Sequence, residues 1–197
     1  FTGHEIHSNG KKTYCIELAD INEDGDLDII TGNSGQTNHW YENDGTQSFT
    51  GHEIHSNAKE TEFMKVADIN EDGLLDIITG NSGEKDYWYE NDGTGNFTAH
   101  EIDSDAKSTT TLKIIDFDND GHLDIITSDY NGPNYWYEND GTQSFTAHEI
   151  HSNNQKTDML KLVDLNEDGD LDFIEGNYNQ KNYWYENDGT QSFTAHE

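Results

Sequence analysis

The stretch DINEDGDLDIITGN, residues 20–33, decides the fold of this chain. Its first nine residues follow the pattern Asp-x-Asn/Asp-x-Asp-Gly-x-x-Asp, which begins at Asp20, Asp68, Asp116 and Asp164, an interval of 48 residues each time. Oxygen-bearing side chains at positions 1, 3, 5 and 9, with glycine at position 6, suit a hard cation such as Ca²⁺. A strict period near 50 residues is typical of a solenoid, a propeller or an array.

Each nine-residue acidic loop is predicted to hold one Ca²⁺, about four in all. The side chains at positions 1, 3, 5 and 9 would be ligands, and position 7 would contribute only its backbone carbonyl, because its side chain varies between copies. The predicted metal residues are Asp20, Asn22, Asp24, Asp26 and Asp28 in the first loop, Asp68, Asn70, Asp72, Leu74 and Asp76 in the second, Asp116, Asp118, Asp120, His122 and Asp124 in the third, and Asp164, Asn166, Asp168, Asp170 and Asp172 in the fourth.

A metal-free turn, an EF-hand or a magnesium site would fit these loops less well. Two carboxylates ~5 Å apart repel by about 3 kcal/mol at an effective dielectric near 20, so four acidic turns without a cation would be costly. An EF-hand requires glutamate at position 12, which holds Thr31, Thr79 and Thr127, and only once Glu175. Mg²⁺ is a poorer candidate than Ca²⁺, because it keeps its waters and seldom uses all-protein cages.

One repeat reads as four short strands. Apolar residues alternate in Tyr14–Ala19, and the acidic turn leads to a second strand at Leu27–Gly32. A polar loop over Asn33–Asn38 precedes a third strand at His39–Asn43. An Asp-Gly hairpin signal then leads to a fourth strand at Ser48–Ser56.

The predicted fold class is therefore all-β: a β-propeller of four 48-residue, four-stranded antiparallel blades. Residues 1–197 would form a single domain. The repeat units would be 10–57, 58–105, 106–153 and 154–197. Four blades are few for a propeller. Either a strand at residues 1–9 closes the last blade, or the ring is larger or built from two chains.

Composition restricts the partners. The formal net charge is -31, and all ten basic residues other than histidine are lysine. Nucleic-acid recognition needs a basic face and relies on arginine, so nucleic acid is excluded as a partner. No apolar run is long enough to insert into a membrane. Cys15 is the only cysteine, so no intrachain disulfide can form.

The sequence resembles the FG-GAP/VCBS repeat family of calcium-binding β-propellers, which includes the integrin α-subunit head. The resemblance rests on residues 20–33, on WYENDGTQSF at residues 40–49, and on their three later copies. It implies a structural Ca²⁺ in each turn between strands. It also implies an extracellular or cell-surface protein that works in adhesion, in glycan binding or as a scaffold.

Two further columns of the repeat carry aromatic and histidine side chains. The Trp40-Tyr41 pair and its copies are expected to pack between blades, one ring on each side, although they could form sugar platforms. The His4-Glu5-Ile6-His7 segment and its copies could suggest zinc, but positions i and i+3 of a strand face opposite sides. We expect these histidines to be solvated edge residues.

The sequence therefore predicts a non-catalytic calcium-binding module, extracellular or on the cell surface, which acts as an adhesion or assembly scaffold. Its partner would be a protein or glycan of a cell surface or matrix, with self-assembly through the terminal strands as a further hypothesis. The alternative is a propeller lectin that uses the variable inter-strand loops. A polysaccharide-degrading enzyme or its accessory domain is less favoured, because no catalytic constellation stands out.

Overall fold

The chain folds entirely into antiparallel strands. The structure is a computed structural model that describes residues 3–6, 12–56, 59–103, 105, 107–151, 156–190 and 192–196. These residues form 16 strands in two sheets, and no helix occurs among them. The all-β prediction is confirmed.

The strands form four consecutive groups, here called units 1 to 4. Unit 1 contains β1 (Thr13–Ala19), β2 (Asp28–Gln36), β3 (His39–Asn43) and β4 (Phe49–Glu53). Unit 2 contains β5 (Lys59–Ala67), β6 (Asp76–Glu84), β7 (Tyr87–Asn91) and β8 (Phe97–Glu101). Unit 3 contains β9 (Lys107–Ile115), β10 (Asp124–Asp129), β11 (Asn134–Asn139) and β12 (Phe145–His151). Unit 4 contains β13 (Thr157–Val163), β14 (Asp172–Asn177), β15 (Tyr183–Asn187) and β16 (Phe193–His196).

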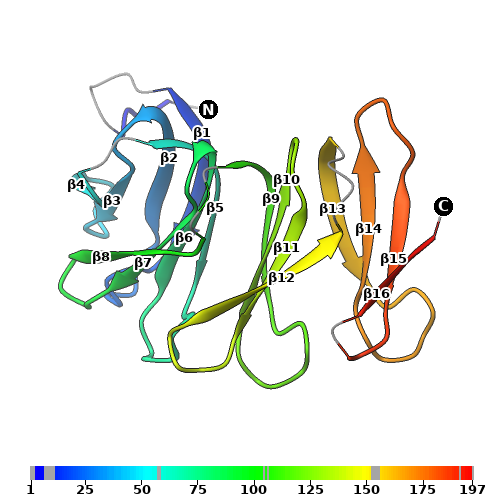
Figure 1. The fold of residues 1–197 in the computed structure, drawn as a ribbon. Coiled ribbons are helices and arrows are strands. Elements are labelled where there is room, and N and C mark those ends of the chain that lie inside the picture. The colour runs from blue at the N-terminus through cyan, green and yellow to red at the C-terminus, as the bar shows by residue number, and fades with distance from the viewer. Residues whose placement is uncertain are drawn as a thin grey trace.

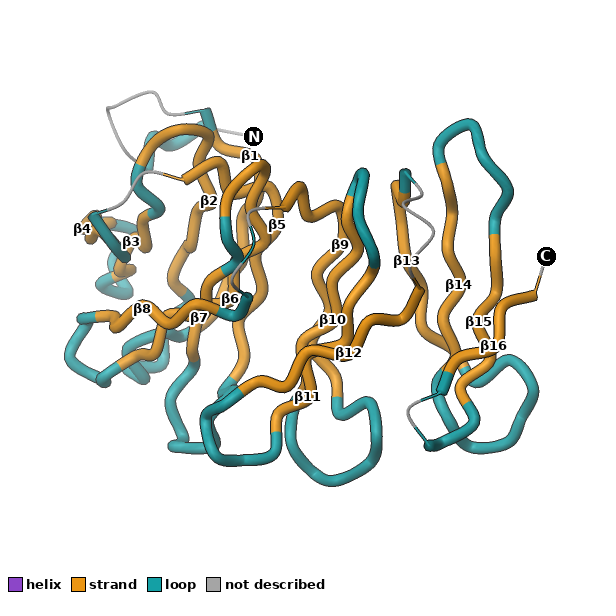
Figure 2. The backbone as a smooth tube through the Cα atoms, viewed as in Figure 1, coloured by secondary structure: helices purple, strands orange, loops and turns teal. Residues whose placement is uncertain are grey.

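Within each unit every strand pairs antiparallel with the next one along the chain. The first strands β1, β5, β9 and β13 adjoin one another, so the units stand side by side (Figure 1). The loops that join the first two strands of units 2, 3 and 4 emerge at the lower edge of the view in Figure 2. These are three of the four acidic loops.

The second strand is longer than the sequence predicts. The expected loop Asn33–Asn38 is instead strand as far as Gln36, because the end of β2 pairs with β5 of the next unit, Ser34 opposite Glu60. The end of β6 pairs with β9 in the same way. These links join units 1 to 3 into one 12-stranded sheet, and unit 4 forms a separate four-stranded sheet. Residues of the next unit, which a local pattern cannot show, therefore set the end of the strand.

The hydrophobic core is divided among the junctions between units. Between units 1 and 2, Ile30 and Trp40 of one unit pack with Met64, Ile77 and Tyr89 of the next. The same arrangement recurs between units 2 and 3 and between units 3 and 4. Each of these junctions thus receives tryptophan from one side and tyrosine from the other, as the packing interpretation of the Trp-Tyr pair predicts.

The described residues do not form a closed ring. Units 1 and 4 lie at opposite ends of the array in Figure 1, and no strand pairing joins them in the part of the chain that the structure describes. Of the proposed closing strand at residues 1–9, only 3–6 are described, and these are not in a strand. The rest of that prediction lies outside the described residues.

Candidate metal centres in the acidic loops

Each acidic loop is a tight turn whose backbone folds around the first aspartate. Glycine at position 6 has a positive φ, between 93° and 102°, and position 4 is also left-handed, at 59° for Glu23. The Asp20 carboxylate accepts hydrogen bonds from the backbone N–H groups of Asp24 and Gly25, at 3.0 and 2.9 Å. The second and fourth loops repeat both contacts. The turn therefore points the side chains of positions 1, 3 and 5 toward one another.

The aspartate at position 9 has a second role, because it is fully buried and ties the loop to the sheet. Asp28 accepts the N–H of Ile21, at position 2, and the N–H of Asn43, at the end of β3, at 3.1 and 2.8 Å. Asp76, Asp124 and Asp172 make the corresponding pair of bonds. A carboxylate has about four lone-pair sites, so two of these bonds leave capacity for a cation.

The residue at position 2 packs against the following unit and connects the loop to it. Ile21 is 3% exposed and lies in the core between units 1 and 2. Its carbonyl accepts a hydrogen bond from the Asn91 side chain of unit 2 at 2.9 Å, and Asn139 of unit 3 makes the same bond to Ile69. The first two loops are therefore part of the contact between units as well as turns within a unit.

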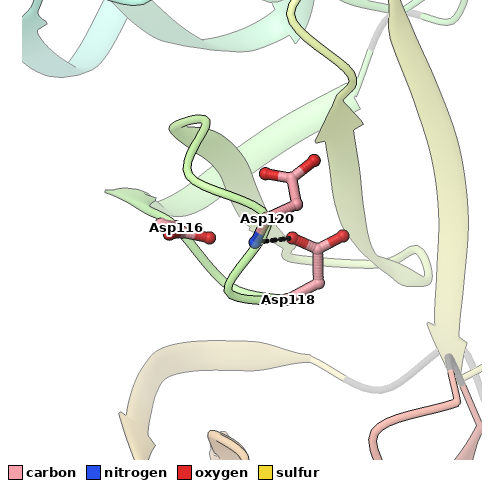
Figure 3. A group of neighbouring side chains, drawn as sticks. All are labelled: Asp116, Asp118 and Asp120. Carbon is pink, nitrogen blue, oxygen red and sulfur yellow. Dashed lines mark hydrogen bonds between the residues drawn. The ribbon is translucent and has the colours of Figure 1, made fainter.

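The third loop has a carboxylate at all four predicted side-chain ligand positions, whereas each of the other loops has three. Asp116, Asp118 and Asp120 each offer a carboxylate oxygen within 4.8 Å of the others, and Figure 3 shows the three side chains around one turn. The Asp120 N–H donates to Asp118 at 3.2 Å, but Asp116 Oδ1 is buried without a hydrogen-bond partner among the described residues. A buried, unpaired oxygen beside two more carboxylates is what a hard cation would satisfy, so these residues fit Ca²⁺.

Burial and crowding disfavour charge in these loops when no cation is bound. Burial raises the pKa of Asp76 and of Asp124 to about 6, although hydrogen bonds from backbone N–H groups lower it in part. The pKa of Asp118 is raised by burial and by its acidic neighbours Asp120, Glu138 and Asp116. A bound cation would reverse these shifts by favouring the charged forms.

The position-7 side chains lie against the hairpin between the third and fourth strands of their own unit. Each position-7 side chain lies next to the glycine of that hairpin. A Cβ built on the glycine would be only 2.5 to 3.2 Å from the side chain, which is Asp26, Leu74, His122 or Asp170. His122 also pairs with Glu71 of unit 2 at 2.6 Å. These contacts are compatible with a ligand role for the backbone carbonyl alone.

Sequence reasoning missed a network beside each loop. The first histidine of each His-Glu segment stacks on the unit's tryptophan, as His52 does on Trp40 at 4.5 Å, and bonds a glutamate, Glu42, at 2.9 Å. Units 2, 3 and 4 repeat both contacts. Glu42 also accepts from Asn22, at position 3 of the loop, at 3.4 Å. These histidines do lie on the outer strands, and His52, His100 and His196 are 36 to 40% exposed, as expected of edge residues, but their contacts with tryptophan and glutamate were not predicted. The glutamate that recurs every 48 residues was the available signal.

The four units and their loops define a repeat protein of antiparallel β units with acidic turns. The FG-GAP-like repeat family matches residues 20–79, 68–127 and 116–175, each match beginning at the first residue of an acidic loop. The chain belongs to this family.

Solved structures share the fold at low sequence identity. A lectin from Agrocybe aegerita, described with its specific recognition of non-reducing terminal N-acetylglucosamine, is 21% identical with a TM-score of 0.62, covering 94% of this chain and 52% of its own. BBS1N in complex with ARL6DN, soaked with lead, is 13% identical with a TM-score of 0.60, covering 89% and 54%. The same complex soaked with mercury is 11% identical with a TM-score of 0.60, covering 88% and 54%. The chain spans about half the length of these proteins.

The chain has no match among curated protein sequences. Among the described residues, no helix is long and apolar enough to cross a membrane.

Proposed function

We propose that the chain is a calcium-binding β-propeller module that acts as a non-catalytic scaffold outside the cell or at its surface. The observation that carries the proposal is the third loop, where three carboxylates converge and a buried oxygen of Asp116 has no partner among the described residues. The same sequence pattern in four loops supports one Ca²⁺ in each unit. About four ions would reduce the formal charge of -31 to about -23.

In this proposal the metal is structural. The first two loops hold position-2 residues in the core between units and accept hydrogen bonds from the next unit. Ca²⁺ would fix the loop and thereby the contact between neighbours. The chain's own residues would supply ligands and a rigid turn.

Thermal unfolding of the whole chain in excess Ca²⁺, excess Mg²⁺ and excess EDTA tests this function. A ligand that binds only the folded state stabilises it by about 2.7 kcal/mol per site at 100 times its Kd. We expect EDTA to lower the Tm sharply and Ca²⁺ to restore it more fully than Mg²⁺. An unchanged Tm would contradict a structural cation.

The third loop should bind most tightly, because it has a carboxylate at position 3 where the other loops have asparagine. Asp116→Ala removes a charged ligand and should reduce calcium affinity more than Asn70→Ala, which removes a neutral one. Calorimetric titration of the two variants measures the difference. A larger loss from Asn70→Ala would overturn the ranking.

The assembly role rests on the apolar faces at the two ends of the array. Ile16 and Leu18 of β1 are 60% and 61% exposed, and Leu165 and Val163 of unit 4 are 49% and 39% exposed. Their counterparts at inner junctions pack against the adjacent unit, so each end presents half of a junction. The occupant we propose is a further unit of the same kind, supplied by a second copy of the chain. This head-to-tail contact would join the arrays of two chains into a longer one.

Sedimentation across a concentration series tests the assembly. We expect the calcium-saturated chain to associate, and Ile16→Ser or Leu165→Ser to abolish association without lowering the Tm measured at a concentration where the natural chain is monomeric. Lys12→Ser, an exposed change elsewhere on unit 1, is the control. A chain that stays monomeric at all concentrations would contradict end-to-end assembly.

A lectin is the second candidate, favoured by the likeness to the Agrocybe aegerita lectin. The buried tryptophans of units 1 to 3 are packed between units, so they do not offer sugar platforms. The surface that remains is the variable loops Ser34–His39, Ser82–Tyr87, Tyr130–Tyr135 and Tyr178–Tyr183. A glycan array that includes terminal N-acetylglucosamine tests this candidate. Calcium-dependent binding to a glycan would support a lectin, and the absence of binding to any glycan would exclude it.

A further inference from the structure

A chain of buried hydrogen bonds crosses the junction of units 1 and 2 through one threonine. The Asn38 amide donates to the Thr61 hydroxyl at 2.9 Å, and this hydroxyl donates to Asn81 at 2.7 Å. Asn81 donates its own amide to the Lys85 carbonyl at 2.7 Å. The three side chains are 0 to 5% exposed. Every group in this chain is neutral, and every acceptor in it has a donor.

The same order recurs at the junction of units 3 and 4. There the three places are occupied by Asn134, Thr157 and Asn177, with contacts of 3.5 and 3.2 Å. Thr157 also contacts Glu175 at 2.6 Å. An amide on each side of a threonine is therefore a feature of the repeat.

The junction of units 2 and 3 keeps the threonine but has an aspartate at each end of the chain. Asp86 replaces the first asparagine, and Asp129 replaces the second. Thr109 lies opposite Asp129 in the pairing of β9 with β10, as the threonines of the other junctions lie opposite their asparagines. Both aspartates are buried, at 2% and 1% exposed. Two groups that can be charged therefore lie where the repeat has two amides.

An ionised pair of aspartates cannot form this chain. A carboxylate only accepts hydrogen bonds, and a threonine hydroxyl has one hydrogen to donate. The Thr109 hydroxyl donates to one oxygen of Asp86 at 2.7 Å, and the other oxygen accepts the Asn81 N–H at 2.8 Å. Neither oxygen of Asp129 has a hydrogen-bond partner in the described part of the chain, and both are closed to solvent. Burying a carboxylate without a partner is costly, so charge is disfavoured at this position.

The charged and titratable groups around the pair are engaged with one another. Asp103, after β8, accepts hydrogen bonds from the Lys107 ammonium of β9 at 2.9 Å and from the Tyr137 hydroxyl of β11 at 2.8 Å. The Lys107 ammonium also lies 3.7 Å from the centre of the Tyr135 ring. Because Asp103 and Lys107 have opposite charges, together they leave the charges of the two buried aspartates uncompensated.

Burial dominates the titration of both aspartates. It raises the pKa of Asp86 to about 7, although hydrogen bonds lower it in part, and the neighbours Asp129 and Asp103 raise it further. It also raises the pKa of Asp129 to about 7, although the attraction of Lys107 lowers it in part. Aspartate in an unfolded chain titrates near ~3.9. Between these values the folded chain holds protons that the unfolded chain has released.

We propose that the junction of units 2 and 3 is a proton-operated contact, in which protonation of Asp86 and Asp129 restores the hydrogen-bond chain of the other junctions. Protonated Asp86 donates to Thr109, as the asparagine amide does elsewhere. The Thr109 hydroxyl is then available to Asp129. Protonated Asp129 can donate to the carbonyl of Pro133, which holds the place of the Lys85 carbonyl. Both protons come from the solvent, and the contact is independent of the calcium sites.

This contact should be tightest in mildly acidic solution. An acid whose pKa is raised by folding contributes stability below its unfolded pKa, and this contribution is lost as the pH rises toward its folded pKa. Two such groups should weaken the contact between units 2 and 3 as the pH rises from ~4 to ~7. The neutral chain at the junction of units 1 and 2 should not respond.

Denaturant unfolding of the calcium-saturated chain between pH ~4.5 and pH ~8 tests this contact. The double variant Asp86→Asn/Asp129→Asn has the residues of the other units, so it should fold. Relative to the double variant at the same pH, we expect the folding equilibrium constant of the natural chain to fall about hundredfold per pH unit between pH ~4.5 and ~6. For each single variant we expect a fall of about tenfold or less. Asp158→Asn, at an exposed position of β13, removes a charge elsewhere and should keep the natural pH dependence.

Two threonine variants test whether the hydroxyl connects the aspartates. Thr109→Val removes the hydroxyl and keeps the side-chain volume, and Thr61→Val is the matched control at the junction of units 1 and 2. We expect Thr109→Val to destabilise the chain more at pH ~8 than at pH ~4.5, because it removes the one hydroxyl donor from an ionised pair. Thr61→Val should cost the same at both pH values. A natural chain with the pH dependence of the double variant, or a Thr109→Val effect that does not change with pH, would overturn the proposal.

Discussion

The junctions inside the array and the faces at its ends are built from the same repeat. Only the junctions bury the apolar side chains of that repeat. The first-strand residues Met64, Leu112 and Leu160 are each 2% exposed, whereas Ile16, at the same place in unit 1, is 60% exposed. At the other end, Leu165 is 49% exposed, and its counterparts Ile21, Ile69 and Phe117 are 1 to 3% exposed. The repeat pattern therefore supplies an apolar side chain, and the adjacent unit decides whether it becomes core.

The difference extends to the acidic loops. In loops 1 to 3 the position-2 residue is buried against the next unit, whereas in loop 4 it is exposed. A cation in an inner loop would stabilise a turn and a junction together. In loop 4, as the structure describes it, a cation would stabilise the turn alone. The same nine residues thus have different consequences at different places in the array.

Tryptophan truncation should give the largest contrast. Trp88 is 1% exposed in the core between units 2 and 3, and Trp184 is only partly buried on the end face. We expect Trp88→Ala to cost about 3–5 kcal/mol of unfolding free energy and Trp184→Ala less than half of that. Denaturant unfolding of both variants measures it. Equal costs would mean that the end face is covered in solution.

The pH dependence of folding stability should distinguish the junction of units 2 and 3 from the other junctions. Burial raises the pKa of Asp86 to about 7, whereas aspartate in an unfolded chain titrates near ~3.9. The folded chain therefore keeps a proton that the unfolded chain releases, and stability falls as the pH rises from about 4 to about 7. The other units have asparagine at this place.

Asp86→Asn should remove that loss. We expect the variant to be more stable than the natural chain by about 4 kcal/mol at pH 8 and nearly equal to it below pH ~4. Asp158→Asn controls for the change in net charge. Identical pH dependence of Asp86→Asn and the natural chain would show that Asp86 is not the titrating group.

The smallest contrast concerns the loops themselves. Asp72 and Asp168 both occupy position 5, in loops 2 and 4. In saturating calcium we expect Asp72→Asn to lower the unfolding free energy by about 1–2 kcal/mol and Asp168→Asn by less, because loop 4 anchors no following unit among the described residues. Chemical unfolding of the two variants measures this. A larger loss from Asp168→Asn would show that the stability a loop contributes does not depend on the junction beside it.

Much of the fold could be predicted because it repeats locally. The expected third strand His39–Asn43 agrees with β3, and the alternating residues from Tyr14 to Ala19 fall within β1. The acidic turn could be located because glycine and aspartate specify it within nine residues. The extension of β2 to Gln36 and the stacking of His52 on Trp40 depend on partners that a local pattern does not show. Ring closure depends on still more distant contacts.

The central claim is that each unit holds its own calcium ion, and native mass spectrometry of the chain purified in calcium tests it most directly. We expect about four bound ions, lost stepwise on chelation, with the ion of the third loop retained longest. Asp118→Asn makes position 3 of that loop like the other three and should remove this preference. A chain that carries no calcium under these conditions would contradict the claim.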